Sequence, residues 1–401
     1  MNSLSKTLAI AGFVATAVAL PASTAPAAGS KNCEELIFKV SATAQNREIL
    51  VQPDVSNFNS FVEFLTQNVS YTQISGSEKI VARYCRPTIV NIQASQQSKT
   101  LQLLVHGNTY DKHYWSGLGF EDYNYEACAN SLGYPTLAID RPGNGQSTRP
   151  NGATHVQAPY QVELIHKLIQ SLRGPGIVLP GAPQTAVAPF ERVVWVGHSY
   201  GSIIGNQLAA KYPADVDAYV LMGIAIPKPT DFALPGQWEM GFQPASEYDP
   251  VRFPYTDKTY FVTSSKAGRM ATFYSDPAAP DFDAAVYDAD FATMGTITAG
   301  EALTQTLAVA DRFAGPVFVL TGQEDATFCG NGKREPVLPD CLSGSESRLA
   351  KVHDLFPQSS FFDFFAQPDA GHCHGTHYTA QQGFEATSDF LARAFSSAVS
   401  A

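Results

Sequence analysis

The segment that most clearly suggests chemistry is Gly-His-Ser-Tyr-Gly at residues 197–201, which directly follows the apolar run VVWV. It fits the pattern G-x-S-x-G, in which a serine occupies a sharp turn between a strand and a helix. Glycine suits both flanking positions because a Cβ atom would crowd such a turn. The following helix would also point its amino-terminal end at the serine, favouring negative charge there. We therefore predict that Ser199 is a catalytic nucleophile; the alternative is a glycine-rich turn with an incidental serine.

Strands and helices that could position this serine alternate along the chain. Short runs rich in β-branched and aromatic residues predict buried strands at 101–105, 135–139, 193–196, 218–222, 317–320 and 360–365. Helical patterns lie at 120–132, 160–172, 202–211, 345–355 and 384–398. This alternation favours an α/β fold with a mostly parallel central sheet flanked by helices. Residues 34–91 combine β-like runs with a helical pattern near 58–67, and predict antiparallel edge strands.

Four segments resemble, in the same order, the α/β-hydrolase family. LLVHGNTY at 103–110 is similar to the family's strand ending in His-Gly, and AIDRPGNGQS at 138–147 is similar to its next strand and loop. The serine turn comes third, and segments that hold an acid and a histidine come last. The resemblance covers about residue 100 to the carboxyl terminus, apart from an insert described below. It implies an α/β-hydrolase fold and a catalytic triad in the order serine, acid, histidine.

The resemblance also suggests which residues complete the triad. The family's acid follows the strand after the insert at a G-x-x-D spacing, which Asp325 matches, with Glu324 as the second candidate. The family's histidine follows a small residue or glycine, which His372 matches best, with His374 and His377 as alternatives. Three histidines so close together could instead bind a metal. Serine chemistry needs no metal, however, and no carboxylate cluster accompanies them, so we expect neither a metal nor a cofactor.

Stabilisation of a tetrahedral oxyanion requires hydrogen-bond donors close to the serine. The resemblance implies the backbone N–H groups of Tyr200 and Asn108, with Thr109 as an alternative for the second donor. We expect His106, which precedes these loop residues, to shape the loop rather than to transfer protons. In the implied mechanism the triad histidine takes the serine's proton and returns it to the leaving group, and water then hydrolyses the acyl-enzyme.

Departures from the family's subgroups narrow the predicted activity. The HGGG loop of many lipases and esterases and the HGGPG of proline iminopeptidases are absent. Epoxide hydrolases and haloalkane dehalogenases of this fold use an aspartate where Ser199 stands. We therefore predict a serine hydrolase that cleaves a carboxylic ester or lactone of a small hydrophobic molecule. The alternatives are an acyltransferase, a non-hydrolytic lyase or cyclase acting on a secondary metabolite, and a non-catalytic binding protein, for which a broken triad would be expected.

Residues 226–304 interrupt the alternation of strands and helices and are too long for a simple loop. We interpret them as an inserted helical cap, which divides the chain into a signal peptide (1–27), a first core part (28–225), the cap (226–304) and a second core part (305–401). The large apolar side chains of the cap either line an apolar pocket or form the cap's own core. They are Trp238, Met240, Phe242, Tyr248, Phe253, Tyr255, Tyr260, Phe261, Met270, Phe273 and Tyr274.

The amino-terminal residues predict export. A lysine, the apolar run at residues 7–20 and the small residues after it fit a secretory signal, and the run is too short to span a bilayer. No later segment reads as membrane-spanning, so we expect a soluble, secreted protein. The tripeptide NVS makes Asn68 a possible glycosylation site.

Six cysteines suit an oxidising compartment. Cys329 and Cys341 flank a Gly/Pro-rich loop and are the first candidate pair, and Cys33 with Cys85 is the second. This leaves Cys128 and Cys373 to pair or remain free. The net charge of −11 excludes the basic surface that nucleic-acid binding requires and disfavours anionic membranes. We expect a small-molecule substrate; the oligomeric state stays open.

Overall fold

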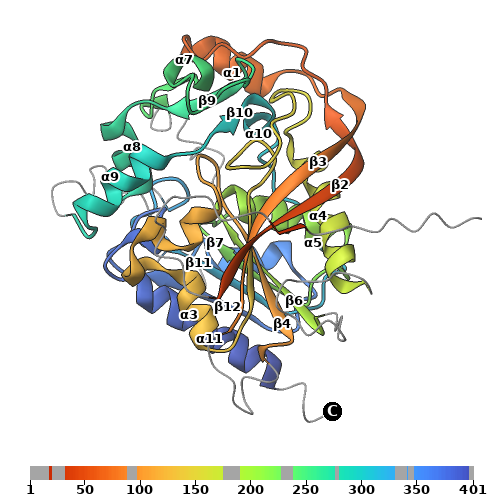
Figure 1. Cartoon of the computed structure of the whole chain (residues 1–401), viewed down its shortest axis with the longest axis vertical. Helices are drawn as coiled ribbons and strands as arrows, with labels where there is room; N and C mark the ends of the chain where they lie inside the picture. The colour runs from red at the N-terminus through yellow and green to blue at the C-terminus, as the bar shows by residue number, and fades with distance from the viewer. Residues whose placement is uncertain are drawn as a thin grey trace, which may run out of the picture.

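The computed structural model describes residues 18–19, 32–87, 97–174, 190–226, 238–275, 280–329, 341 and 347–396 (Figure 1). Apart from residues 18–19, the predicted signal peptide lies outside the described residues. No helix in the described part combines the length and the apolar character needed to cross a membrane.

A nine-stranded sheet forms the centre of the described chain, in the order β1-β2-β3-β5-β4-β6-β7-β11-β12. From β5 to β12 neighbouring strands are parallel, whereas β1, β2 and β3 pair antiparallel and β3 also runs antiparallel to β5. This confirms the mostly parallel sheet and all six predicted strands. Their bounds are β1 Val18–Ala19, β2 Cys33–Arg47, β3 Tyr71–Cys85, β4 Thr100–Val105, β5 Thr136–Ile139, β6 Arg192–His198, β7 Ala218–Met222, β11 Val317–Gly322 and β12 Phe362–Gln367.

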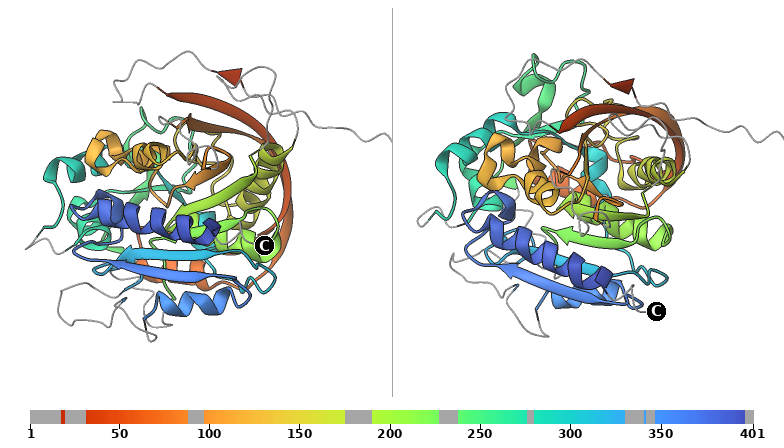
Figure 2. Two further views of the ribbon diagram at one scale, coloured as in Figure 1. Left: turned by 90° about the horizontal axis from the view of Figure 1, so that it is seen from below. Right: turned by 60° about the horizontal axis from the view of Figure 1, so that its bottom comes forward.

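Strands β4, β5, β6, β7 and β11 are buried on both faces, which explains their apolar runs, whereas β12 is half-buried. On β6, Val193 and Trp195 belong to the core on one face, and Val194 and Val196 to the core on the other. Helices α4 (Ala158–Arg173) and α5 (Tyr200–Lys211) contribute to the first core. Helices α3 (Tyr125–Ser131) and α11 (Ala380–Ser396) contribute to the second, where α11 runs along β11 and β12 (Figure 2).

Two helical predictions differ from the structure in detail. The pattern at 120–132 is divided into a 3₁₀ turn, η3 (Glu121–Tyr123), and α3. The described part of the pattern at 345–355 is a 3₁₀ helix, η4 (Ala350–Leu355), rather than an α-helix. Runs this short often take the tighter 3₁₀ geometry. The other 3₁₀ elements are η1 (Lys112–Trp115), η2 (Gly117–Gly119) and η5 (His374–Thr376).

The antiparallel edge predicted for residues 34–91 is a long hairpin. Strands β2 and β3 pair along their full length, from Cys33 opposite Cys85 to Arg47 opposite Tyr71. Their connection carries α1 (Phe58–Thr66), which confirms the predicted helix. A disulfide joins Cys33 to Cys85 at the open end of the hairpin, and a second joins Cys329 to Cys341. Both candidate pairs are therefore present, and Cys128 and Cys373 are not in disulfides.

The insert between β7 and β11 contains more than the predicted helices. Its three short strands form a separate antiparallel sheet in the order β10-β9-β8. The expectation of a helical insert was therefore incomplete: helices are present, and the Tyr-Phe-Val-Thr run of β9 also pairs with a strand on each side. The bounds are β8 Phe242–Pro244, α7 Ala245–Tyr248, β9 Tyr260–Thr263, α8 Lys266–Phe273, α9 Ala284–Thr293, β10 Ile297–Thr298 and α10 Ala299–Leu303.

The aromatic residues of the insert have several environments. Phe253 and Tyr260 lie in a small core that consists mainly of insert residues. Trp238 and Phe261 share a core with Phe61 and Phe64 of α1, so the amino-terminal hairpin supports the insert from outside (Figure 1). The sequence contained no signal for this contact, which joins segments far apart in the chain. Tyr255 is 99% exposed, on the surface of the insert.

Candidate active site

Ser199 lies in a strained turn between β6 and α5. Its backbone angles are φ 52° and ψ −116°, a region that residues other than glycine rarely occupy. A Cβ on Gly201 would lie 2.0 Å from the carbonyl oxygen of Val105, and one on Gly197 would lie 2.6 Å from the carbonyl carbon of Gly201. The glycines on both sides are therefore sterically necessary, as the sequence pattern predicts.

A continuous chain of hydrogen bonds links three of the predicted site residues. The Oγ of Ser199 lies 2.8 Å from Nε2 of His372, and Nδ1 of His372 lies 2.9 Å from Oδ2 of Asp325. The three residues follow β6, β12 and β11 respectively. Because the carboxyl ends of parallel strands meet at one edge of the sheet, residues far apart in sequence come together there.

The carboxylate of Asp325 is buried and fully engaged. Besides His372, it accepts hydrogen bonds from the hydroxyl of Thr321 at 2.6 Å and from the backbone N–H groups of Thr327 at 2.8 Å and Phe328 at 3.1 Å. Burial alone would raise the pKa of Asp325, but the facing imidazole and these donors outweigh it and lower the pKa. The carboxylate is thus ionised at neutral pH, as needed to stabilise a protonated imidazole.

The two alternative histidines form other contacts. Nδ1 of His374 lies 3.2 Å from Oε1 of Gln367, and Nε2 of His377 accepts the backbone N–H groups of Gly371 at 3.1 Å and Ser275 at 3.3 Å. Burial lowers the pKa of both histidines, that of His377 to about 4. Both rings are therefore neutral near pH 7, and His372 is the histidine that bonds to the serine.

The three histidines do not form a common ligand set. Within the described residues, the one group of three possible metal ligands whose atoms lie within 4.8 Å of one another consists of Asp281, Glu324 and Asp369. Glu324, the second candidate for the triad acid, belongs to this group of carboxylates. Asp325 is the carboxylate that bonds to the histidine.

Two of the predicted oxyanion donors are available. In the described part of the chain, the backbone N–H groups of Asn108 and Tyr200 have no hydrogen-bond partner. The N–H of Thr109, the alternative donor, is bonded to the carbonyl oxygen of Thr296 at 3.0 Å. A Cβ on Gly107 would lie 2.8 Å from the Cβ of Ser199, so this loop passes directly beside the serine.

A buried arginine that sequence analysis did not single out holds the same loop. Arg141 donates from Nε to the carbonyl oxygen of His106 and from Nη2 to that of Gly107, both at 2.9 Å. Its own backbone N–H bonds to Nε2 of His106 at 3.0 Å. Burial, reinforced by Arg141, keeps the pKa of His106 well below its usual value. The contacts are those expected of a loop-shaping histidine, and the DRPG motif was the available signal for Arg141.

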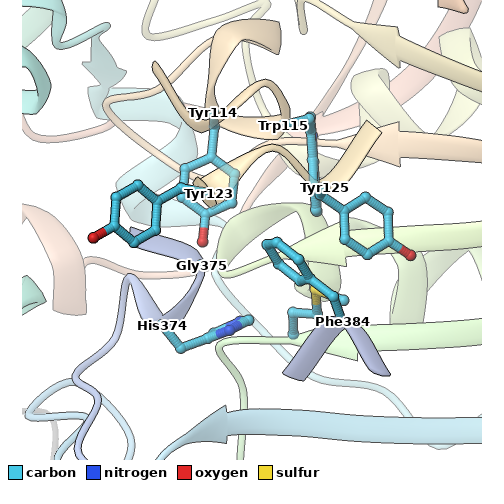
Figure 3. A pocket seen from close by; sticks show the side chains of 8 residues that line it. Tyr114, Trp115, Tyr123, Tyr125, His374, Gly375 and Phe384 are labelled. Atoms are coloured by element: carbon cyan, nitrogen blue, oxygen red, sulfur yellow. The ribbon is translucent and has the colours of Figure 1, made fainter. Parts of the chain in front are cut away.

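A small cavity of about 10 Å³ lies near His374, and its lining residues do not include Ser199. Tyr114 stacks on the ring of His198 at 4.4 Å between centroids and also lines the cavity, together with His374 and Phe384 (Figure 3). A space of this size holds about one water molecule. It is therefore too small to serve as the substrate pocket.

Comparison with known proteins gives a family but no near relative. The model of the "Alpha/beta hydrolase family" matches residues 102–384. No curated protein matches the sequence. An esterase from Thermogutta terrifontis is 16% identical with a TM-score of 0.49, covering 80% of this chain and 95% of its own. An epoxide hydrolase from Vigna radiata is also 16% identical, with a TM-score of 0.46 and coverages of 79% and 95%.

A serine hydrolase involved in carbazole degradation is likewise 16% identical, with a TM-score of 0.44 and coverages of 78% and 95%. The family model is the stronger finding, since it spans more than half of the chain and includes the strands that carry Ser199, Asp325 and His372. The protein belongs to the alpha/beta hydrolase family.

Proposed function

We propose that this protein is a serine hydrolase that cleaves a carboxylic ester or lactone bond in a small hydrophobic molecule. Ser199 is the nucleophile, His372 the base and Asp325 the acid that orients it. The observation that carries this proposal is the unbroken chain of hydrogen bonds from the strained serine through the imidazole to the buried carboxylate. Covalent catalysis by a serine requires a nucleophile, a base and a group that orients the base, all within hydrogen-bond reach of one another.

The geometry suggests the following sequence of steps. Nε2 of His372 accepts the proton of Ser199 as Oγ attacks the substrate carbonyl carbon. The N–H groups of Asn108 and Tyr200 stabilise the resulting oxyanion, helped by the amino-terminal end of α5. The protonated imidazole then gives its proton to the departing alkoxide. Water, activated by the same imidazole, hydrolyses the acyl-enzyme and restores the serine.

Aromatic surroundings support an apolar substrate. The ring of Phe273 in the insert lies 5.3 Å from the ring of His372, and that of Phe328 lies 5.8 Å from it. Apolar side chains around a few polar groups are typical of small-molecule sites. We propose that residues 226–304 form the cap over this site, between core parts 28–225 and 305–401.

We further propose that residues 1–27 are a secretory signal and that the mature protein is extracellular. The two disulfides are compatible with that location. Asn68, the proposed glycosylation site, is exposed just after α1.

The test is labelling with a fluorophosphonate, followed by peptide mass spectrometry, together with turnover of p-nitrophenyl esters of increasing acyl length. We expect the label on Ser199, and we expect Ser199→Ala to lower kcat by at least about 10⁴-fold. Ser388→Ala, on helix α11, is the control and should retain activity, because the hydroxyl of Ser388 bonds to the backbone carbonyl of Phe384 and not to a triad residue. Turnover retained by Ser199→Ala would disprove the nucleophile. Labelling without ester turnover would instead favour acyl transfer or a non-hydrolytic reaction.

A further inference from the structure

The loop that supplies the proposed oxyanion donor Asn108 continues into a strained residue. Thr109 is buried and has a φ of 60°, in the left-handed region that a β-branched residue rarely enters. Such a conformation persists only where surrounding contacts hold it. These contacts fix the peptide unit between Asn108 and Thr109. The Asn108 N–H belongs to the preceding peptide unit, whose Gly107 carbonyl Arg141 holds, so the contacts of Thr109 act on its direction through the backbone of Asn108.

The backbone contacts of Thr109 come from the insert. Its N–H donates to the carbonyl oxygen of Thr296 at 3.0 Å, and its carbonyl oxygen accepts the N–H of Gly295 at 2.8 Å. A Cβ on Gly295 would lie 2.7 Å from the carbonyl oxygen of Tyr110, so only glycine permits this approach. Asn144 of the core accepts the N–H of Thr296 at 2.7 Å and holds the insert segment in register.

The side chain of Thr109 is held by a buried arginine of the insert. Arg269 on α8 is fully buried and donates from Nη1 to the hydroxyl oxygen of Thr109 at 2.8 Å. It forms two further hydrogen bonds, each 2.8 Å long, with the carboxylate of Asp290 on α9. The rings of Tyr110 and Phe273 lie 4.9 Å from its guanidinium carbon. The guanidinium group is therefore fixed in position and orientation.

We propose that Arg269 and the Gly295–Thr296 segment are positioning elements of the oxyanion hole, so that the insert completes the catalytic site as well as covering it. This rests on the proposed function. The insert acts through Thr109 on the Asn108 N–H and makes no contact with the reacting atoms itself. Movement of α8 away from the core would break the bond to Thr109 and misalign the donor. Productive chemistry on an ester carbonyl thus requires the insert in the position described here.

The first test removes the buried charges as a pair. Arg269→Met combined with Asp290→Leu avoids leaving an unpaired buried charge, which would be strongly destabilising. Lys266→Met is the matched control, because Lys266 and Asp288 form an exposed ion pair between the same two helices. The second test uses Thr109→Val, which removes the hydroxyl acceptor, and Thr109→Ser, which retains it.

Loss of one oxyanion donor costs about 10²–10³ in rate, and misalignment should cost part of that. We expect the double variant to lower kcat for a p-nitrophenyl ester about 10- to 100-fold and Thr109→Val about 10-fold, with KM within about 3-fold. Thr109→Ser and Lys266→Met should stay within about 2-fold of the native kcat. Affinity for a trifluoromethyl ketone, which forms a tetrahedral anion on the serine, should fall by the same factor as kcat/KM. Circular dichroism should show folded protein throughout.

The inference is wrong if the folded double variant and Thr109→Val both keep kcat within about 2-fold of Lys266→Met. It is also wrong if only KM rises, since that would make Arg269 a substrate-binding residue. If the double variant does not fold, the comparison of Thr109→Val with Thr109→Ser tests the inference, and equal kcat values in these two variants would contradict it. Turnover retained by Ser199→Ala would instead overturn the proposed function, so the two failures are distinguishable.

Discussion

The parallel sheet and the insert differ in the contacts that hold each of them in place. The sheet combines regular backbone ladders with apolar side chains that alternate between two cores, as on β6. Besides the apolar core that it shares with α1, the insert joins the rest of the protein through irregular backbone bonds and fully buried charged groups. Arg269 bonds to Thr109 of the core, and Arg141 of the core forms an ion pair with Glu301 of the insert.

The two kinds of contact have different effects: apolar burial stabilises the fold, whereas directional contacts fix the positions of individual groups. Burial of apolar area is non-directional and tolerates small shifts, so it stabilises the sheet without aiming any particular donor. Buried ion pairs contribute little net stability, because desolvation offsets their attraction, but they hold their groups in defined geometry. The triad residues follow core strands, whereas the loop beside them is fixed partly by the insert.

The largest expected effect concerns Asp325, which follows strand β11 of the parallel sheet. Asp325→Asn should lower kcat by about 10³–10⁴-fold, because the amide no longer holds the imidazole in the productive tautomer. Steady-state kinetics with a p-nitrophenyl ester measures this. Glu324→Gln, one residue away, is the control and should remain within a few-fold of native. Equal losses in both variants would contradict the assignment of Asp325 as the acid.

A second prediction concerns the edge of the sheet, which is far from the chemistry. Replacing Cys33 and Cys85 by serine should lower the free energy of unfolding by about 2–4 kcal/mol, since the bridge restricts the unfolded chain. The kcat should remain unchanged, because the triad lies on other strands. Urea unfolding followed by fluorescence measures the stability. A large loss of kcat in the folded variant would mean that the hairpin contributes to the site.

The third prediction, which has the smallest effect at any single pH step, tests a contact between the two regions. Nε2 of His377 accepts an N–H from Gly371 of the core and another from Ser275 of the insert. Burial lowers the pKa of His377 from 6.5 to about 4, although a bond to the Cys373 carbonyl opposes this. Between these values the unfolded chain binds a proton that the folded chain does not. Stability should therefore fall as the pH falls from about 6.5 to about 4.

The expected contribution of this histidine is up to about 1.4 kcal/mol per pH unit within that window. Thermal unfolding of the native protein and His377→Gln at several pH values measures it, and the variant should show the shallower dependence. The other buried histidines affect both proteins alike and cancel in the comparison. Identical slopes would show that His377 does not link folding to pH in this range.

Much of the core could be predicted from sequence because its signals are local. A strained turn around Ser199 requires glycine on both sides, and strands buried on both faces require continuous apolar runs. The resemblance to the α/β hydrolases then placed Asp325 and His372 after later strands. The predicted disulfides were likewise indicated by the positions of Cys33, Cys85, Cys329 and Cys341.

From the sequence, the insert could be recognised only because it interrupts the alternation of strands and helices. Its three-stranded sheet depends on pairing between short segments, and its support by α1 joins residues far apart in the chain. The choice of His372 over His374 and His377 also depended on where the ring atoms lie.

The sequence by itself thus determined the type of fold, the serine turn and a short set of possible partners, because backbone sterics and apolar alternation act between near neighbours. Only the tertiary structure decided which histidine bonds to Ser199, that the N–H of Thr109 is already occupied, and that Arg269 of the insert contacts the oxyanion loop. These outcomes depend on distances between residues that are remote in sequence, and no local pattern encodes them.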